Sequence, residues 1–172
     1  MYKILFVGNR NLSRSPMAQF IMQDLVDKAG LHDQFLISSA GGSGIAVVDY
    51  TGEPVHRYAQ AELAKHGISC EGKRAYKMQP EDYDEFDYII VMDRKVLRSV
   101  IRYIHPETDG KISLLMQYAG YGMGDDDRFD EIYDPDLTTD FSEAYKLIRE
   151  GCEGLLEHVN KGLKLNYRTF GE

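Results

Sequence analysis

The sequence predicts an α/β fold: a single doubly wound domain in which a four-stranded parallel sheet carries helices on both faces. Two observations favour this fold. Short apolar runs alternate with helical patterns along the chain, and the runs are mostly apolar, as is typical of strands buried on both faces. The chain has 172 residues and 43% apolar residues, which suits one domain over residues 1–172.

Four segments are predicted as strands. The first, Tyr2–Val7, is short and apolar and is followed directly by the turn residues Gly8 and Asn9. The other three have the same short, mostly apolar character; they are Phe35–Ser39, Tyr88–Met92 and Lys111–Leu115. A glycine-rich loop, Ala40–Glu53, follows the second of these strands, and a long polar loop spans about Tyr118 to Thr139.

Helices are predicted between the strands. Ser15 as N-cap and Pro16 at the first helical position begin a helix that Gly30 ends. The apolar stripe of this helix consists of Met17, Phe20, Ile21, Leu25 and Val26. Further helices are expected from Pro54 to His66, near Arg94–Ile104, and after a capping box formed by Asp140 and Glu143.

Composition limits the classes of function. The net charge of −8 argues against nucleic acid as a general partner, and no apolar run approaches the length of a membrane span. Cys70 and Cys152 suggest neither a disulfide framework nor a metal-binding Cys-x-x-Cys pair. The run Tyr2–Val7 is too short for a signal peptide. We therefore expect a cytoplasmic protein without a metal or other cofactor and without a membrane partner.

The segment between the first strand and the first helix, Gly8–Arg14, is the candidate functional site. In parallel sheets, ligands bind at the carboxyl ends of the strands. A helix N-terminus there presents N–H groups and a favourable dipole to an anion, and Arg14 can bind two phosphate oxygens. From these residues alone, an anion site and an ordinary strand-to-helix turn both remain open.

The run from Asn11 to Ala18, Asn-Leu-Ser-Arg-Ser-Pro-Met-Ala, resembles the phosphate loop of the low-molecular-weight protein tyrosine phosphatases, whose pattern is Cys-x5-Arg-Ser. The similarity continues in order along nearly the whole chain. It includes Ser38–Ala40, Lys65–Ile68, Tyr88–Asp93 and Asp134-Pro135. The resemblance implies the fold of that family and a loop that binds phosphate or sulfate.

The resemblance also implies roles for individual residues. Arg14 matches the phosphate-binding arginine, Ser15 the hydroxyl that hydrogen-bonds the thiolate, and Asn11 the asparagine that shapes the loop. Asp134 matches the acid that protonates the leaving phenolate; the alternative is a turn aspartate before proline. The expected phosphate-binding residues are Asn9, Arg10, Asn11, Leu12, Ser13, Arg14 and Ser15.

Three further residues match the supporting network of the family. Ser39 and His66 match hydrogen-bond partners of the loop, and Asp93 falls where the family has an aspartate near the site. Each of the two ionisable residues has a simpler alternative. His66 lies near a helix C-terminus, where its positive charge is mildly favourable, and Asp93 can serve as a helix N-cap.

The chain departs from the family pattern at the position that matters most for chemistry. Counting back from Arg14 places Gly8 where the family has its nucleophilic cysteine. Arg10 replaces a loop glycine and Ser13 replaces a second common cysteine. A serine hydroxyl without a dedicated base is a poorer nucleophile than a thiolate. The sequence therefore predicts a pseudophosphatase, which binds phosphate or phosphorylated ligands with little or no turnover.

Other readings of the chain remain open at this point. One alternative is an active protein tyrosine phosphatase or a variant of one; an arsenate reductase is less favoured because it needs the loop thiol. The expected ligands are an inorganic anion, a phosphotyrosine protein or a small phosphomonoester. Asp136 and Leu137 stand where the family usually has aromatic residues that line the cleft. Another aromatic residue could line it instead, and the candidates are Tyr50, Tyr118, Tyr121 and Tyr133. The run Asp125–Asp127 is read as a solvated acidic loop rather than a cation site.

Overall fold

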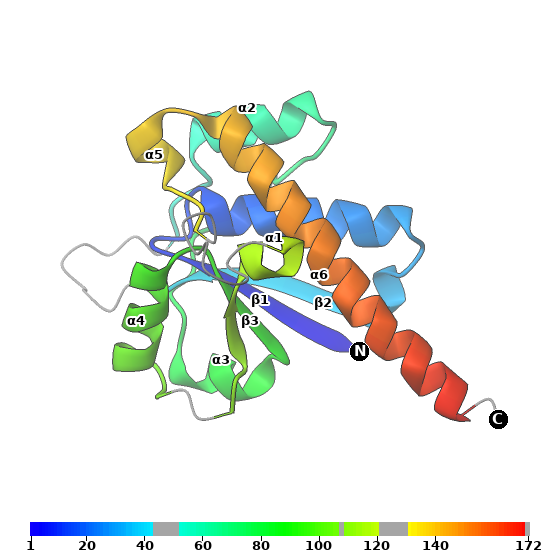
Figure 1. Ribbon diagram of the computed structural model, residues 1–172. Coiled ribbons are helices and arrows are strands. Elements are labelled where there is room, and N and C mark those ends of the chain that lie inside the picture. The colour runs from blue at the N-terminus through cyan, green and yellow to red at the C-terminus, as the bar shows by residue number, and fades with distance from the viewer. Residues whose placement is uncertain (43–51, 107–108, 121–130, 171–172) are drawn as a thin grey trace.

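The structure is a computed structural model that describes residues 1–42, 52–106, 109–120 and 131–170 (Figure 1). Its sheet has four parallel strands in the order β2-β1-β3-β4. The strands are β1 (Tyr2–Gly8), β2 (Phe35–Gly41), β3 (Tyr88–Val91) and β4 (Ile112–Leu114). The predicted fold class and all four predicted strands are confirmed.

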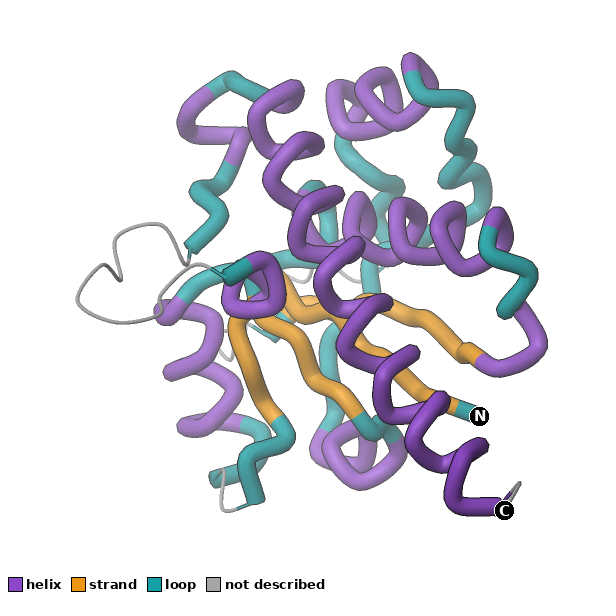
Figure 2. Tube along the Cα trace, turned by 45° about the vertical axis from the view of Figure 1, so that its right-hand side comes forward, coloured by secondary structure: helices purple, strands orange, loops and turns teal. Residues whose placement is uncertain are grey.

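Helices cover both faces of the sheet, as Figure 2 shows. The α-helices are α1 (Arg14–Lys28), α2 (Arg57–Lys65), α3 (Pro80–Glu85), α4 (Arg94–Tyr103), α5 (Pro135–Thr138) and α6 (Phe141–Phe170). The described residues also form two short 3-10 helices, η1 (His32–Gln34) and η2 (Leu115–Ala119). Within the described residues, no helix is both long enough and apolar enough to cross a membrane.

The alternation of side chains along β1 builds a separate core on each face of the sheet. Ile4 and Phe6 point to the face covered by α1 and α6, whereas Leu5 and Val7 point to the face covered by α3 and α4. All four side chains are at most 1% exposed. A central parallel strand buried on both faces explains why Ile4–Val7 is an unbroken apolar run.

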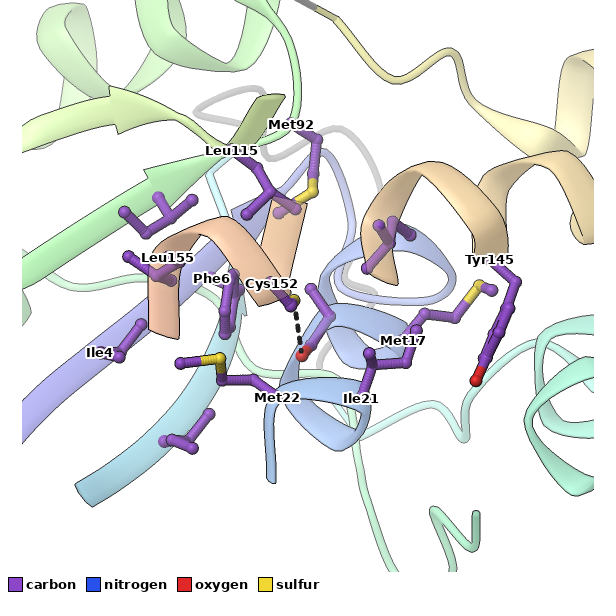
Figure 3. Packing of buried hydrophobic residues seen from close by; sticks show 14 of the residues in the cluster. Ile4, Phe6, Met17, Ile21, Met22, Met92, Leu115, Tyr145, Cys152 and Leu155 are labelled. Carbon is purple, nitrogen blue, oxygen red and sulfur yellow. Dashed lines mark hydrogen bonds between the residues drawn. The ribbon is translucent and has the colours of Figure 1, made fainter. Parts of the chain in front are cut away.

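The larger core lies between β1, α1 and α6 (Figure 3). In this core the Cys152 thiol donates a long hydrogen bond to the Ala18 carbonyl oxygen, at 3.8 Å. Two residues further along α6, a Cβ on Gly154 would lie 2.0 Å from the carbonyl oxygen of Tyr118. Only glycine permits this approach, so Gly154 lets α6 pack directly on the backbone of η2.

Two helix boundaries differ from the predictions. α1 begins at Arg14 with Ser13 as N-cap, and Ser15 is already helical, because the Met17 amide bonds the Ser13 carbonyl and closes the first turn one step earlier. α2 begins only at Arg57, since Pro54 is paired with Arg74 in an isolated bridge.

Of the other local predictions, one helix cap is confirmed, one helix was not predicted, and several features lie outside the described residues. The Glu143 amide donates to Asp140 Oδ1 at 2.9 Å, so Asp140 caps α6 as expected. The short polar helix α3, whose capping box joins Gln79 and Asp82, was not predicted from the sequence. Several predicted features lie outside the described residues, namely most of the glycine-rich loop, Tyr50, Tyr121 and Asp125–Asp127.

Candidate anion-binding site

The candidate loop lies at the switch point of the sheet. From β1 the chain passes to β2 on one side, and later returns to β3 on the other side. The carboxyl ends of β1 and β3 therefore open a crevice where ligands bind in folds of this kind. A small hollow of about 30 Å³ lies there, lined by residues 8–15 and by Asp134.

Asn11 holds the loop in its curved shape. Its Nδ2 donates to Ser15 Oγ and to Ser39 Oγ, both at 2.9 Å, and its Oδ1 accepts the Tyr76 amide at 2.9 Å. Its φ of 59° lies in the left-handed region, which asparagine tolerates better than most residues. The side chain is 1% exposed, so this buried amide is fully used in fixing the loop against β2 and α1.

Arg14 is a buried cation at the end of the loop. Its Nη1 donates to Asp93 Oδ2 at 2.7 Å and to the Ile132 carbonyl oxygen at 2.6 Å. Both contacts use the same nitrogen, which leaves Nε and Nη2 without a partner among the described residues. Two adjacent guanidinium donors of this kind match the geometry of a phosphate or carboxylate edge.

Asp93 has two structural connections at once. Its Oδ1 accepts the Val96 amide at 2.8 Å and caps α4, while its Oδ2 holds Arg14. The two carboxylate oxygens thus tie the first turn of α4 to the first turn of α1. The prediction of Asp93 near the site and its alternative as an N-cap agree equally well with this geometry.

Gly8 ends β1 at the base of the loop. A Cβ built on Gly8 would point at Ser15, at 3.0 Å from Oγ and 3.2 Å from Cβ. The backbone of Gly8 does not adopt a positive φ, unlike Gly30 or Gly67. Its conformation therefore does not require glycine, and a side chain at this position would face the N-terminus of α1.

Neither thiol of the chain lines the hollow, and both are buried. Cys152 lies in the core between α1 and α6, and Cys70 lies in the segment after α2. Burial raises the pKa of both thiols above the ordinary value for cysteine. Both groups therefore stay protonated near neutral pH, and a protonated thiol is a weak nucleophile.

The structure does not bring His66 into the network of Ser39. His66 Nε2 lies 3.4 Å from Glu62 Oε1, and the imidazole stacks on the Tyr145 ring with centroids 3.7 Å apart. Its place at the C-cap of α2 agrees with the simpler alternative. The hydroxyl of Ser39 instead donates to Gln19 Oε1 at 2.5 Å.

Sequence reasoning missed Gln19 and Lys73 as neighbours of Ser39. Gln19 follows Ser15 by one helical turn, and this spacing was a usable signal. Lys73 donates from Nζ to the Ser39 carbonyl oxygen at 3.0 Å. The sequence carries no signal for this contact, because a loop and the whole of α2 separate Lys73 from Ser39 along the chain.

Asp134 lines the hollow opposite the loop, immediately before α5. The neighbouring Tyr133 is 69% exposed, but it does not line the hollow. Tyr118, another candidate for the cleft wall, instead pairs its hydroxyl with Ser113 and packs edge-on against His158. The side chains of residues 136 and 137 lie outside the described part of the chain.

The Lys73 contact gives a prediction about stability and pH. Burial lowers the pKa of Lys73 from 10.5 to about 8, so the unfolded state binds its proton more tightly than the folded state. Between about pH 8 and pH 10.5 the free energy of unfolding should therefore rise with pH. We expect a rise of about 1 kcal/mol, reduced from the full shift because the ammonium is partly solvated.

Urea unfolding near neutral pH and near pH 10 measures this effect. Lys73→Met should remove the rise that the native chain shows, whereas Lys146→Met, at an exposed lysine on α6, should keep it. If both variants retain the same pH dependence, Lys73 is solvated in the folded protein.

The fold and the loop together define an α/β protein in which a tight turn leads from the first strand to the N-terminus of the first helix. Residues 3–165 match the family of low molecular weight phosphotyrosine protein phosphatases. The chain is 35% identical to the low molecular weight protein-tyrosine-phosphatase YfkJ of Bacillus subtilis over 165 residues, which is 96% of this chain and 100% of YfkJ. The chain therefore belongs to this family.

Three further matches agree. PtpA of Staphylococcus aureus, also a low molecular weight protein-tyrosine-phosphatase, is 30% identical over 96% of this chain and 98% of its own. The crystal structure of YfkJ matches with a TM-score of 0.84 over 94% of this chain and 96% of that chain. The structure of SP-PTP from Streptococcus pyogenes matches with a TM-score of 0.75 at 31% identity, over 92% of this chain and 93% of that chain.

Proposed function

We propose that this protein is a pseudophosphatase, which binds phosphate or a phosphorylated ligand in the loop of residues 8–15 and turns it over very slowly or not at all. The observation that carries the proposal is Gly8. A Cβ there would face Ser15 and the start of α1, which is where a nucleophile would be activated by the helix terminus. Glycine offers no atom that can attack phosphorus.

The binding half of the proposal is supported by the groups that surround Gly8. The N-terminus of α1 favours an anion, and Arg14 keeps two guanidinium nitrogens for it while Asp93 fixes the third. Asn11 holds the loop in a preformed curve. None of these features depends on a thiol, so the loop can retain affinity where chemistry is lost.

The proposed ligands are a phosphotyrosine protein or a small phosphomonoester, with Asp134 retained at the hollow. A cytoplasmic location is part of the proposal. It is supported by the two free cysteines, both buried and unpaired, because structural disulfides are rare in reducing compartments.

One preparation tests both halves of the proposal. Calorimetric titration with inorganic phosphate should show saturable binding, and an aryl phosphate assay of the same sample should show turnover about a millionfold below that of an ordinary enzyme, the factor expected when a nucleophile is lost. Turnover near 10 per second, typical of enzymes, would favour an active phosphatase instead. Absence of phosphate binding at millimolar concentrations would leave the loop without an anion role.

A further inference from the structure

The outward face of α4 carries only positive charge. Arg94, Lys95, Arg98 and Arg102 fall within an arc of about 100° at the helical repeat of 3.6 residues, and α4 contains no acidic residue. The opposite side of the helix is held in the core by Val96 and Val100. This basic face of α4 is thus a single stripe rather than scattered charges.

At the start of the stripe the Arg94 amide donates to Glu131 Oε1 at 2.8 Å, so a carboxylate lies beside Arg94. Lys95, Arg98 and Arg102 are exposed, and within the described ranges no ion pair joins them to a carboxylate. The guanidinium of Arg102 lies over the Tyr103 ring, 5.2 Å from its centroid. α3, on the same face of the sheet, is acidic in its first turn but makes no described ion pair with α4. Such a patch is unusual in a chain whose net charge is −8.

The stripe begins beside the candidate anion site. α4 starts directly after Asp93, whose carboxylate holds Arg14 at 2.7 Å. From there the helix runs away from the carboxyl ends of the strands, along the edge of the molecule opposite the C-terminus of α6 (Figure 1). Arg94 and Arg102 are eight residues apart, a span of about 12 Å.

We propose that the basic face of α4 is a docking surface for acidic residues next to the phosphorylated residue of a protein ligand. The inference rests on the proposed function and names its ligand more closely. An extended segment advances about 3.3 Å per residue, so about four residues follow the stripe from Arg94 to Arg102. Positive side chains at this spacing complement carboxylates along such a segment.

An acidic peptide fits the charge distribution better than nucleic acid does. Screening limits the field of exposed charges to about 10 Å at 0.1 M salt, so a short segment meets mainly the local stripe. A long polyanion crosses more of a surface whose net charge is −8 and is repelled.

The experiment compares two phosphotyrosine peptides, one flanked by glutamates and one by serines, together with the unphosphorylated acidic peptide and inorganic phosphate. We expect the chain to bind the acidic phosphopeptide about tenfold more tightly than the serine peptide at low salt, as two or three surface pairs allow. The double variant Arg98→Gln with Arg102→Gln should lose this preference. Its phosphate affinity should stay unchanged, because neither residue lines the hollow.

A matched control removes the same charge elsewhere. Lys28→Gln with Lys146→Gln changes two lysines of the other helical layer and should keep the preference. Equal affinity for the two phosphopeptides, or equal losses in both double variants, would overturn the proposal. So would tighter binding of anionic vesicles or duplex DNA than of the acidic peptide through Arg98 and Arg102.

Failure of the proposed function looks different from failure of this inference. If phosphate and the serine phosphopeptide do not bind but the unphosphorylated acidic peptide binds through Arg98 and Arg102, the loop lacks its anion role while α4 docks acidic segments. If phosphate binds but the two phosphopeptides bind equally well, the loop binds anions as proposed and the basic face of α4 does not dock the peptide.

Discussion

The substitution Gly8→Cys is expected to raise aryl phosphate turnover by at least about a thousandfold. Losing a nucleophile costs about a millionfold in a well-studied hydrolase, and the remaining groups around the loop are in place here. A thiol at this position would face the N-terminus of α1 and lie near Arg14, and both lower a thiol pKa. The same assay with the native chain gives the baseline.

Strain is the main obstacle to this gain. The added Cβ would lie 3.0 Å from Ser15 Oγ, so Ser15 must shift by a few tenths of an ångström. Adding Arg10→Gly to Gly8→Cys gives the loop more freedom at the position where the family has glycine. A folded protein with both changes and no turnover would show that the catalytic frame has been lost along with the nucleophile.

Two controls separate chemistry from geometry. Gly8→Ala adds the same Cβ without a thiol and should leave turnover at the baseline. Adding Asp134→Ala to Gly8→Cys should lower the restored rate by about a hundredfold or more if Asp134 acts as general acid. An unchanged rate would mean that Asp134 only lines the hollow.

Replacing Arg14 with alanine is expected to weaken phosphate binding by at least about a hundredfold. Two hydrogen bonds from a charged donor contribute about 1.5 to 3 kcal/mol each, and each 1.4 kcal/mol is about a tenfold change in affinity. Phosphate titration calorimetry measures the loss. Binding that survives in Arg14→Ala would place the anion elsewhere on the protein.

Loss of the fold must be separated from loss of the site, because Arg14 is only 5% exposed and its removal leaves Asp93 with one partner fewer. Arg14→Lys keeps the charge but not the paired donors, so it should fold and show an intermediate affinity. Asp93→Asn removes a nearby negative charge but keeps an oxygen that can accept from Arg14 Nη1, so phosphate binding should stay intact or become stronger. Circular dichroism of each variant confirms that the protein is folded.

The sequence by itself determined the class of fold because parallel strands buried on both faces leave a strong local signal. Ile4–Val7 and Tyr88–Val91 are unbroken apolar runs, and they lie in the two central strands of the sheet. The predicted start of α2 at Pro54 was wrong, because Pro54 instead pairs in a bridge with Arg74, twenty residues away in sequence. α3 left little apolar pattern because only its Tyr83 reaches the core deeply.

In the candidate site too, some features follow from the order of residues along the chain, whereas others depend on contacts between residues distant in sequence. The loop, Arg14 and the absence of a cysteine at position 8 are matters of order along the chain, so the sequence was sufficient to name them. Only the tertiary structure decided which groups are in contact. Arg14 bonds Asp93 and the Ile132 carbonyl oxygen, Ser39 bonds Gln19 and Lys73, and His66 stacks on Tyr145. The partners of Arg14 come together because the carboxyl ends of parallel strands converge on one edge of the sheet, and the other pairs form where helices and loops pack against each other.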